Sequence, residues 1–269
     1  MDDSLELLRA TGADSSTLFS SINMPISKES RRIRRMFADI SRRYDLLNHV
    51  LSLNVDRAWR RRTALELDVQ PGHRILDVCT GTADLALELA GRVRTEDGGH
   101  VCGADFCHEM VAIGEAKRRR RREERLTLLV GDTLALPFPD SSFDRVAVAF
   151  GARNLCDLDG GLREMRRVLN PGGRLAILEF TTPRTKWFRT LFGFYFHSVL
   201  PLLGRWLSDH PSGADAYSYL PASVAEFPQP DELTERLSRA GLTSARYRLF
   251  TGGIAALHLA ERPRVEVNS

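Results

Sequence analysis

The stretch "PGHRILDVCTGTADLALELA", residues 71–90, decides the fold. A turn at Pro71-Gly72 precedes an apolar run short enough for a buried strand, and a tight loop follows that contains Gly81. Leucines and alanines then continue to Ala90 with the character of a buried helix. A strand, a tight loop and a helix in this order are typical of the first unit of a parallel α/β sheet.

The same alternation continues along the chain. Four further apolar runs have the length of buried strands: "HVCGADF" (100–106), "RLTLLVGD" (125–132), "FDRVAVAFG" (143–151) and "RLAILEF" (174–180). A helix is predicted over about residues 108–122, and another carries Leu162, Met165, Val168 and Leu169 and stops at the turn "NPGG". Strands that alternate with helices predict a parallel sheet covered on both faces.

The C-terminal part predicts the edge of this sheet. A helix near residues 229–240 precedes the strand-like runs "SARYRLF" (244–250) and "IAALHLA" (254–260). The short "TGG" segment between these runs predicts an antiparallel pair. We therefore expect an α/β fold of the Rossmann-like kind, with a seven-stranded, mostly parallel sheet and an antiparallel last strand.

The predicted domain organisation is one large domain with an extension. Residues 1–27 are polar and lack periodicity, so we expect a loosely ordered extension before a single domain over residues 28–264. Ile33, Met36, Phe37 and Ile40 recur at helical spacing, which predicts a helical cover over residues 28–68. Residues 184–228 are predicted to form an inserted helical region, in which the segment 187–203 is strongly apolar and aromatic.

The charge pattern bears on the partners. The chain of 269 residues has a net charge of only +3, yet residues 28–62 contain eleven basic and four acidic side chains. Such a stretch either forms solvated helix faces or steers the protein toward phosphates or an anionic bilayer. The run "KRRRRREER" (117–125) lacks interleaved aromatic residues, so we interpret it as a solvated helix end and expect no nucleic-acid partner.

Other segments indicate the compartment. No apolar run reaches the roughly 18 residues of a membrane span, and the N-terminus does not read as a secretory leader. The four cysteines form no CxxC pair, so we expect reduced thiols, a cytoplasmic protein and no bound metal. Peripheral contact with a membrane surface and a homodimer are both compatible with this pattern.

Three consecutive predicted strands end in residues suited to a nucleoside ligand. Ligands of open parallel sheets bind beyond the carboxyl ends of the strands. The first loop offers Asp77, Gly81 and Thr82, and its single glycine does not make the fuller cradle that a dinucleotide needs. Asp105 could accept both ribose hydroxyls, Asp132 the adenine amino group, and the Thr133 N–H could reach a ring nitrogen. Each aspartate alone could be a turn or cap residue, but together they fit S-adenosylmethionine.

The chain resembles the class I S-adenosylmethionine-dependent methyltransferases, and within them the C-methyltransferases of quinone biosynthesis. The segment "YDLLNHVLSLNVDRAW" (44–59) is similar to that family's N-terminal pattern, with Leu47 for the usual Met and Asp56 for the usual His. The first loop has "TGTAD" instead of the common "GGTGD", which resembles menaquinone-type members, and Ala149 replaces a serine of some relatives. Four further blocks agree in order: "FGARN" (150–154), "RRVLNPGGRLAILEF" (166–180), "YSYLPASVAEFP" (217–228) and "TGGIAALH" (251–258).

The resemblance implies methylation of a polyprenylated quinol, converting demethylmenaquinol to menaquinol, with the corresponding ubiquinone step as the alternative. Arg153 is expected to favour the phenolate of the quinol, Asn154 to hold a ring oxygen, and Tyr44 to lie near the reacting ring. The alternative for Arg153 is an ion pair with Asp157 or Asp159. A scaffold subunit that binds cofactor or quinone without catalysis, and an RNA methyltransferase, are the rival functions.

Overall fold

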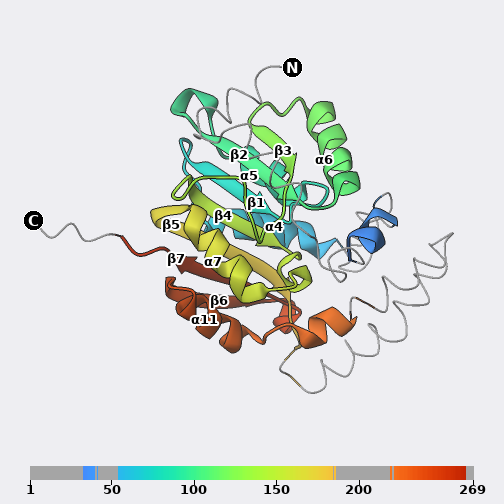
Figure 1. The fold of residues 1–269 in the computed structure, drawn as a ribbon, viewed down its shortest axis with the longest axis vertical. Coiled ribbons are helices and arrows are strands. Elements are labelled where there is room, and N and C mark those ends of the chain that lie inside the picture. The colour runs from blue at the N-terminus through green and yellow to red at the C-terminus, as the bar shows by residue number, and fades with distance from the viewer. Residues whose placement is uncertain are drawn as a thin grey trace, which may run out of the picture.

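Seven strands form one sheet in the order β3-β2-β1-β4-β5-β7-β6 (Figure 1). The computed structural model describes residues 33–39, 41, 54–183, 185, 219 and 221–264. The strands are β1 (Arg74–Val78), β2 (His100–Asp105), β3 (Leu126–Val130), β4 (Phe143–Ala149), β5 (Leu169–Phe180), β6 (Thr243–Phe250) and β7 (Ala255–Glu261).

The pairing confirms the predicted sheet. β1 pairs with β2 and β4, β2 with β3, and β4 with β5, all in parallel. β7 is antiparallel to both of its neighbours, β5 and β6. The chain first builds outward from β1 to β3 and then returns to add β4 on the other side of β1. The order of strands therefore reverses between β1 and β4, which is where ligands bind in open α/β sheets.

Helices cover both faces of the sheet, as predicted from the alternation. They are α4 (Val55–Glu66), α5 (Asp84–Ala90), α6 (His108–Arg121), α7 (Leu158–Val168) and α11 (Pro230–Arg239), with short 3-10 turns η1 (Thr95–Asp97), η2 (Ala152–Asn154) and η4 (Thr251–Gly253). Residues 33–39 and 221–226 are also helical.

Two apolar cores lie on opposite faces of the sheet. One joins Trp59 of α4 and the leucines of α5 to alternate residues of the strands, such as Ile75 and Leu257. The other joins α7 and α11 to the intervening strand residues, such as Leu76. Neighbouring residues of one strand point to opposite faces, so both faces of the central strands are apolar.

The junction between α7 and β5 differs from the prediction. The sequence "NPGG" was expected to end the helix as a separate turn, but α7 already ends at Val168, and Leu169 begins β5. β5 pairs with β4 at Leu169, opposite Phe143, and resumes at Arg174, opposite Arg145, so the "NPGG" residues form an irregular excursion in the strand. Gly172 permits this excursion because its φ of 80° lies in the left-handed region.

Several predicted segments fall largely outside the described residues. The extension 1–27 and the apolar segment 187–203 lie there, as does much of the helical cover between residues 42 and 53. Within the described part of the chain, no helix combines the length and the apolar character needed to cross a membrane.

Candidate active site

The loop between β1 and α5 is held in a strained conformation beside the end of β4. Cys79, Gly81 and Ala83 have φ values of 51°, 56° and 67°, and Phe150 after β4 has a φ of 61°. Non-glycine residues in the left-handed region store strain that commonly marks ligand sites. A Cβ atom at Gly151 would lie 2.3 Å from Cβ of Cys79, so a glycine is required where these two strand ends approach each other.

Asp105, at the end of β2, connects this loop to the start of α6. Its Oδ2 accepts a hydrogen bond from the Gly81 N–H at 2.8 Å, and its Oδ1 accepts one from the Cys107 N–H at 2.9 Å. Burial raises the pKa of Asp105 to about 6, although the two N–H donors oppose this rise. Each carboxylate oxygen has two lone pairs, so Asp105 can still accept one hydroxyl on each oxygen. This geometry fits a ribose.

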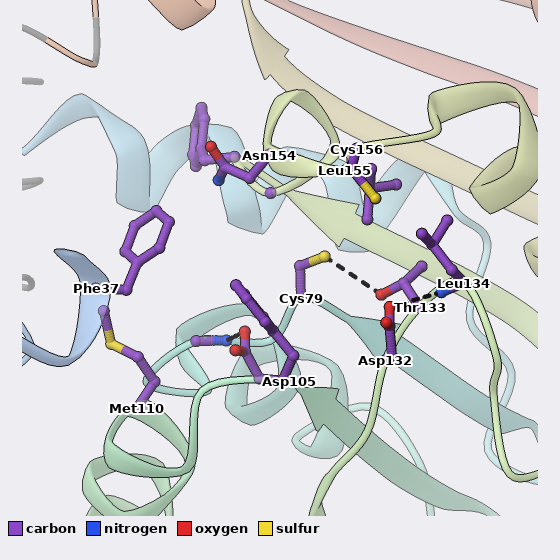
Figure 2. Close-up of a pocket in the computed structure, with 14 residues that line it drawn as sticks. Phe37, Cys79, Asp105, Met110, Asp132, Thr133, Leu134, Asn154, Leu155 and Cys156 are labelled. Atoms are coloured by element: carbon purple, nitrogen blue, oxygen red, sulfur yellow. Dashed lines mark hydrogen bonds between the residues drawn. The ribbon is translucent and has the colours of Figure 1, made fainter. Parts of the chain in front are cut away.

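The predicted adenine residues line the same pocket as Asp105. The pocket has an empty volume of about 650 Å³ and is lined by Asp105, Asp132, Thr133 and Gly81. Asp132 forms a local turn, because its Oδ1 accepts the Leu134 N–H at 2.9 Å, and Thr133 Oγ1 lies 3.4 Å from Cys79 Sγ. Figure 2 shows Phe37 and Met110 at the side of the pocket that faces Asp132 and Thr133. Asp132 is therefore both a turn residue and a wall of the pocket.

Asp77 and Thr82 lie at a smaller cavity of about 310 Å³ beside the first. The two cavities share Cys79 and Gly81 as lining residues. The Thr82 hydroxyl is hydrogen-bonded by Lys117 Nζ at 2.9 Å, and Lys117 also pairs with Asp84 at 2.6 Å. The Thr82 hydroxyl thus accepts a hydrogen bond from α6, and its own O–H is a donor.

Asp77 is a buried carboxylate with one free acceptor. Its Oδ2 accepts a hydrogen bond from the Thr80 hydroxyl at 2.6 Å, whereas Oδ1 is buried and has no hydrogen-bond partner within the described residues. Burial raises the pKa of Asp77 to about 7, while the Thr80 hydroxyl and the Arg60 guanidinium lower it. An unpaired buried acceptor is costly unless a ligand supplies the missing donor.

A third, larger cavity begins where the first one ends. It has an empty volume of about 1510 Å³ and is lined by residues of the 33–39 helix, η2 and the 221–228 segment. Asn154 lines both this cavity and the pocket formed by Gly81, Asp105, Asp132 and Thr133, which is called the nucleoside pocket below (Figure 2). Its Oδ1 accepts a hydrogen bond from the Tyr219 hydroxyl at 3.1 Å. The remaining polar group of the Asn154 side chain is the amide NH₂, a donor.

Arg153 does not pair with Asp157 or Asp159. Its Nη1 forms a buried ion pair with Glu179 Oε1 at 2.6 Å and also donates to the Phe150 carbonyl at 2.6 Å. Both of these aspartates have other partners. Asp157 caps α7 through the Gly160 N–H, and Asp159 pairs with Arg236. Arg153 still lines the larger cavity, but Glu179 balances its charge.

Reasoning from the sequence missed three residues of this region. Glu179 was a lone carboxylate at the end of an apolar strand, which is a usable signal. Tyr219 lay inside a block matched only as a whole, and Arg60 was one of three consecutive arginines with nothing to distinguish it. Tyr44, predicted to lie near the reacting ring, is outside the described residues.

The basic run at the end of α6 agrees with a solvated helix end. Arg118 and Arg119 both pair with Glu115 at 2.8 Å, and Arg125 pairs with Glu123 at 2.7 Å. The exception is Lys117, which contacts Thr82 in the loop between β1 and α5 (residues 79–83), called the nucleoside loop below. Three arginines of this run are therefore paired with glutamates, and Arg120 and Arg121 are exposed on the helix end.

The residues that line the cavities suit S-adenosylmethionine in their chemistry. Asp105 has acceptors suited to ribose hydroxyls, Asp132 and Thr133 line the same pocket, and the smaller cavity is lined by Asp77, whose Oδ1 has no hydrogen-bond partner in the described residues. Known structures share the fold. The cyclase SpnF matches with a TM-score of 0.65 at 16% identity over 90% of this chain and 99% of its own. A SAM-dependent methyltransferase from Aquifex aeolicus matches with a TM-score of 0.54 at 19% identity, over 75% and 88%.

Proteins of similar sequence identify the family of this chain, whereas the solved structures show only its fold. Demethylmenaquinone methyltransferase of Thermus thermophilus is 48% identical over 85% of this chain and 100% of its own length. The ubiquinone/menaquinone biosynthesis C-methyltransferase UbiE of Geobacter sulfurreducens is 43% identical over 88% and 91%. Residues 24–262 match the profile of the ubiE/COQ5 methyltransferase family. Since that match covers most of the chain and the relatives are this similar, the chain belongs to the ubiE/COQ5 methyltransferase family.

Proposed function

We propose that the protein transfers a methyl group from S-adenosylmethionine to a ring carbon of demethylmenaquinol, forming menaquinol. The observation that carries this proposal is that two cavities adjoin each other. The nucleoside pocket and the larger cavity share Asn154 in their linings, so a methyl donor in one would lie beside an acceptor in the other. Relatives from Thermus thermophilus and Deinococcus radiodurans bear the name demethylmenaquinone methyltransferase, which favours this substrate over a ubiquinone precursor.

Carbon methylation requires an electron-rich ring. S-adenosylmethionine supplies an electrophilic methyl group on a sulfonium. The quinol hydroxyl next to the reacting carbon gives up its proton, and the ring carbon then forms the new C–C bond while the pair of the C–S bond returns to sulfur. The ring proton is lost afterwards, which restores the aromatic ring. The protein must therefore orient the ring and stabilise the oxygen that becomes negative.

Asn154 is the proposed donor to that oxygen. Because the Tyr219 hydroxyl engages Oδ1, the amide NH₂ is the group of Asn154 that remains for a ligand. An N–H donor stabilises a developing phenolate more than a neutral hydroxyl, so it favours the reactive form. Tyr219 acts through Asn154 as a positioning residue. Tyr219→Phe should lower kcat several-fold with little change in cofactor affinity, and an unchanged kcat would remove this role.

Arg153 and Tyr44 complete the proposed catalytic set. The ion pair with Glu179 places the Arg153 guanidinium at the wall of the larger cavity. Its remaining N–H groups could order the quinol or a water that takes the proton, although Glu179 offsets its charge. Tyr44 is proposed to lie near the reacting ring, on the basis of its place in the family pattern alone. Tyr44→Phe with both kinetic constants intact would return that stretch to a purely structural role.

The proposed substrate implies that the enzyme contacts a membrane. A polyprenyl tail partitions into a bilayer, so the enzyme is proposed to work at the membrane surface as a peripheral protein on the cytoplasmic side. The basic stretch 28–62 supports contact with anionic lipids.

The deciding experiment compares two acceptors in one assay. Purified protein is incubated with labelled S-adenosylmethionine and either a short-chain demethylmenaquinol or the corresponding ubiquinol precursor, both kept reduced. We expect transfer to demethylmenaquinol and a much lower rate with the other ring. Transfer only to the ubiquinol precursor would select the alternative. Tight cofactor binding without transfer to either would favour a scaffold.

The RNA methyltransferase alternative needs its own variant. Lys117 contacts Thr82 and Asp84, so changing it would disturb the nucleoside loop. Arg119, Arg120 and Arg121 are exposed and can be neutralised together. The quinol methyltransferase should keep its activity in this triple variant, whereas an RNA enzyme should lose salt-sensitive RNA binding.

A further inference from the structure

The smaller cavity beside the nucleoside pocket has the chemistry of a site for an α-amino acid. One wall carries a cation, Arg60, and another carries the buried carboxylate of Asp77. An α-amino acid is a zwitterion with an ammonium and a carboxylate two bonds apart. A cation and an unpaired carboxylate in one small cavity complement both of its charges.

Arg60 projects from the buried face of α4 and is only 8% exposed. Its Nη1 pairs with Asp56, one turn earlier on the same helix, and its guanidinium carbon lies 5.3 Å from the centre of the Phe150 ring. A guanidinium has five N–H donors in a planar fork, and Asp56 does not use them all. Packing on Phe150 and pairing with Asp56 fix the plane of this fork before any ligand arrives.

The position of the cavity matches the cofactor proposed above. Because it shares Cys79 and Gly81 with the nucleoside pocket, the two cavities adjoin at the β1–α5 loop, where one extended ligand would span both. The part of S-adenosylmethionine beyond the ribose is an α-amino acid chain. Asp77 Oδ1, buried and without a partner in the described part of the chain, lacks the donor that an ammonium would supply.

We infer that Arg60 binds the carboxylate of the amino-acid end of S-adenosylmethionine, opposite the ammonium held by Asp77. This inference rests on the proposed function and assigns α4 a direct part in the cofactor site. The N-terminal cover then contributes a ligand-binding residue as well as packing against the sheet. Among the described residues that line this cavity, Arg60 is the only cation that could pair with a ligand carboxylate.

Three ligands distinguish the contribution of the ligand carboxylate to binding from that of the ligand ammonium. S-adenosylhomocysteine carries both the ammonium and the carboxylate, its decarboxylated analogue carries only the ammonium, and 5′-methylthioadenosine carries neither. Their affinities are measured by calorimetry, so no step of catalysis enters the readout. Since a charge-assisted hydrogen bond contributes about 1.5–3 kcal/mol, each lost contact should weaken binding by about 10- to 100-fold.

Removing Arg60 alone would take this partner from the buried Asp56 carboxylate, so the test uses the paired variant Asp56→Asn/Arg60→Gln. In this variant, binding of S-adenosylhomocysteine should fall by about 10- to 100-fold, while the affinities for the decarboxylated analogue and for methylthioadenosine stay within about threefold of the unmodified protein. Asp77→Asn should weaken both ammonium-bearing ligands and spare methylthioadenosine. Arg145→Gln, which changes a buried arginine bonded to the Leu67 carbonyl, is the control for general loosening.

The outcomes are distinct. Equal losses for all three ligands in the paired variant, or no loss for any, would overturn the assignment of Arg60. If the unmodified protein bound none of the three, the proposed function itself would fail instead. A loss confined to the ligand with a carboxylate supports the inference.

Discussion

At the scale of single residues, the buried pair of Arg153 and Glu179 bears on stability and on the catalytic role proposed for Arg153. The two side chains are 6% and 2% exposed, so neither charge is well solvated. Arg153→Ala would leave the Glu179 carboxylate buried without its partner, which typically costs about 3–5 kcal/mol. We expect chemical denaturation to show a loss of that order in the free energy of unfolding, together with lower turnover.

The lost turnover of Arg153→Ala therefore has two causes that a second variant separates. Arg153→Met/Glu179→Gln removes both charges and should recover most of the stability, since paired removal of a buried ion pair is often tolerated. If Arg153 acts on the quinol, this stable variant still turns over slowly. Turnover equal to that of the unmodified protein would contradict a catalytic role and leave the pair purely structural.

Asp77 predicts a dependence of stability on pH. Its pKa in the folded, ligand-free protein is about 7, mainly because of burial, compared with 3.8 for an ordinary aspartate. Between these two pH values the folded state binds more protons than the unfolded state, so this group's contribution to stability is present below about pH 4 and is lost as the pH rises through 7. Each unit of difference in pKa corresponds to about 1.4 kcal/mol, so the effect reaches a few kcal/mol.

Asp77→Asn should isolate that effect. The amide keeps an acceptor for the Thr80 hydroxyl and cannot ionise. We expect the ligand-free variant to be more stable than the unmodified protein at pH 8, with a difference that shrinks as the pH falls to 4. Denaturant titrations at both pH values measure it. A difference that is independent of pH would show that ionisation of Asp77 is not its cause.

At the scale of elements, α6 packs against the nucleoside loop through Gly114. A Cβ atom there would lie 3.0 Å from both Ala83 Cβ and Leu128 Cδ1, closer than real Cβ contacts normally are. Gly114→Ala gains about 1 kcal/mol of helix propensity, but overpacking a buried contact costs about 1–3 kcal/mol. We expect a net destabilisation of about 1 kcal/mol and weaker cofactor binding, because α6 must shift away from the loop.

A matched variant on the same helix measures the propensity term alone. Ala116 is exposed on α6, so Ala116→Gly should cost about 1 kcal/mol without changing cofactor affinity. Thermal unfolding and calorimetry on both variants give the comparison. Stabilisation by Gly114→Ala with unchanged affinity would mean that the loop tolerates the extra methyl group.

The helices and strands were largely predictable because apolar runs and turn residues, which mark them, lie within short stretches of sequence. The apolar runs predicted all seven strands, and the short "TGG" connection predicted the antiparallel pair β6–β7. The "NPGG" excursion was misread, because proline and glycines resemble a turn whether or not the strand resumes beyond them. Whether the strand resumes after these residues depends on pairing with β4, which is a contact between distant parts of the chain.

Site residues at the ends of strands were predictable from the sequence. Site residues that are placed by the packing of helices or of distant strands were not. Asp105, Asp132 and Thr133 meet in one pocket because parallel strands bring their carboxyl ends to the same edge. The alternative considered for Arg153 was an ion pair with its sequence neighbours Asp157 or Asp159, but the structure pairs it with Glu179 from β5. Arg60 and Tyr219 reach the site from helices whose position no local pattern specifies.

For the whole molecule, the uneven charge predicts how it meets its lipid substrate. The net charge is +3, with the basic excess concentrated in residues 28–62. At the end of this stretch and just beyond it, Arg57, Arg61 and Leu65 follow one another at four-residue spacing on the exposed face of α4, and Leu65 is 52% exposed. A face that combines basic side chains with an exposed leucine suits the headgroup region of an anionic bilayer.

We expect the protein to sediment with anionic vesicles, less so at high salt, and hardly with neutral ones. Arg57→Glu/Arg61→Glu should weaken this binding by about tenfold or more, because each basic residue near a charged surface contributes about 1 kcal/mol. Arg120→Glu/Arg121→Glu changes the net charge by the same amount at the exposed end of α6 and should matter much less. Equal losses in the two variants would mean that total charge, and not the face of α4, governs the attraction. A selective loss would orient α4, and with it the cavities that it borders, toward the membrane from which the quinol enters.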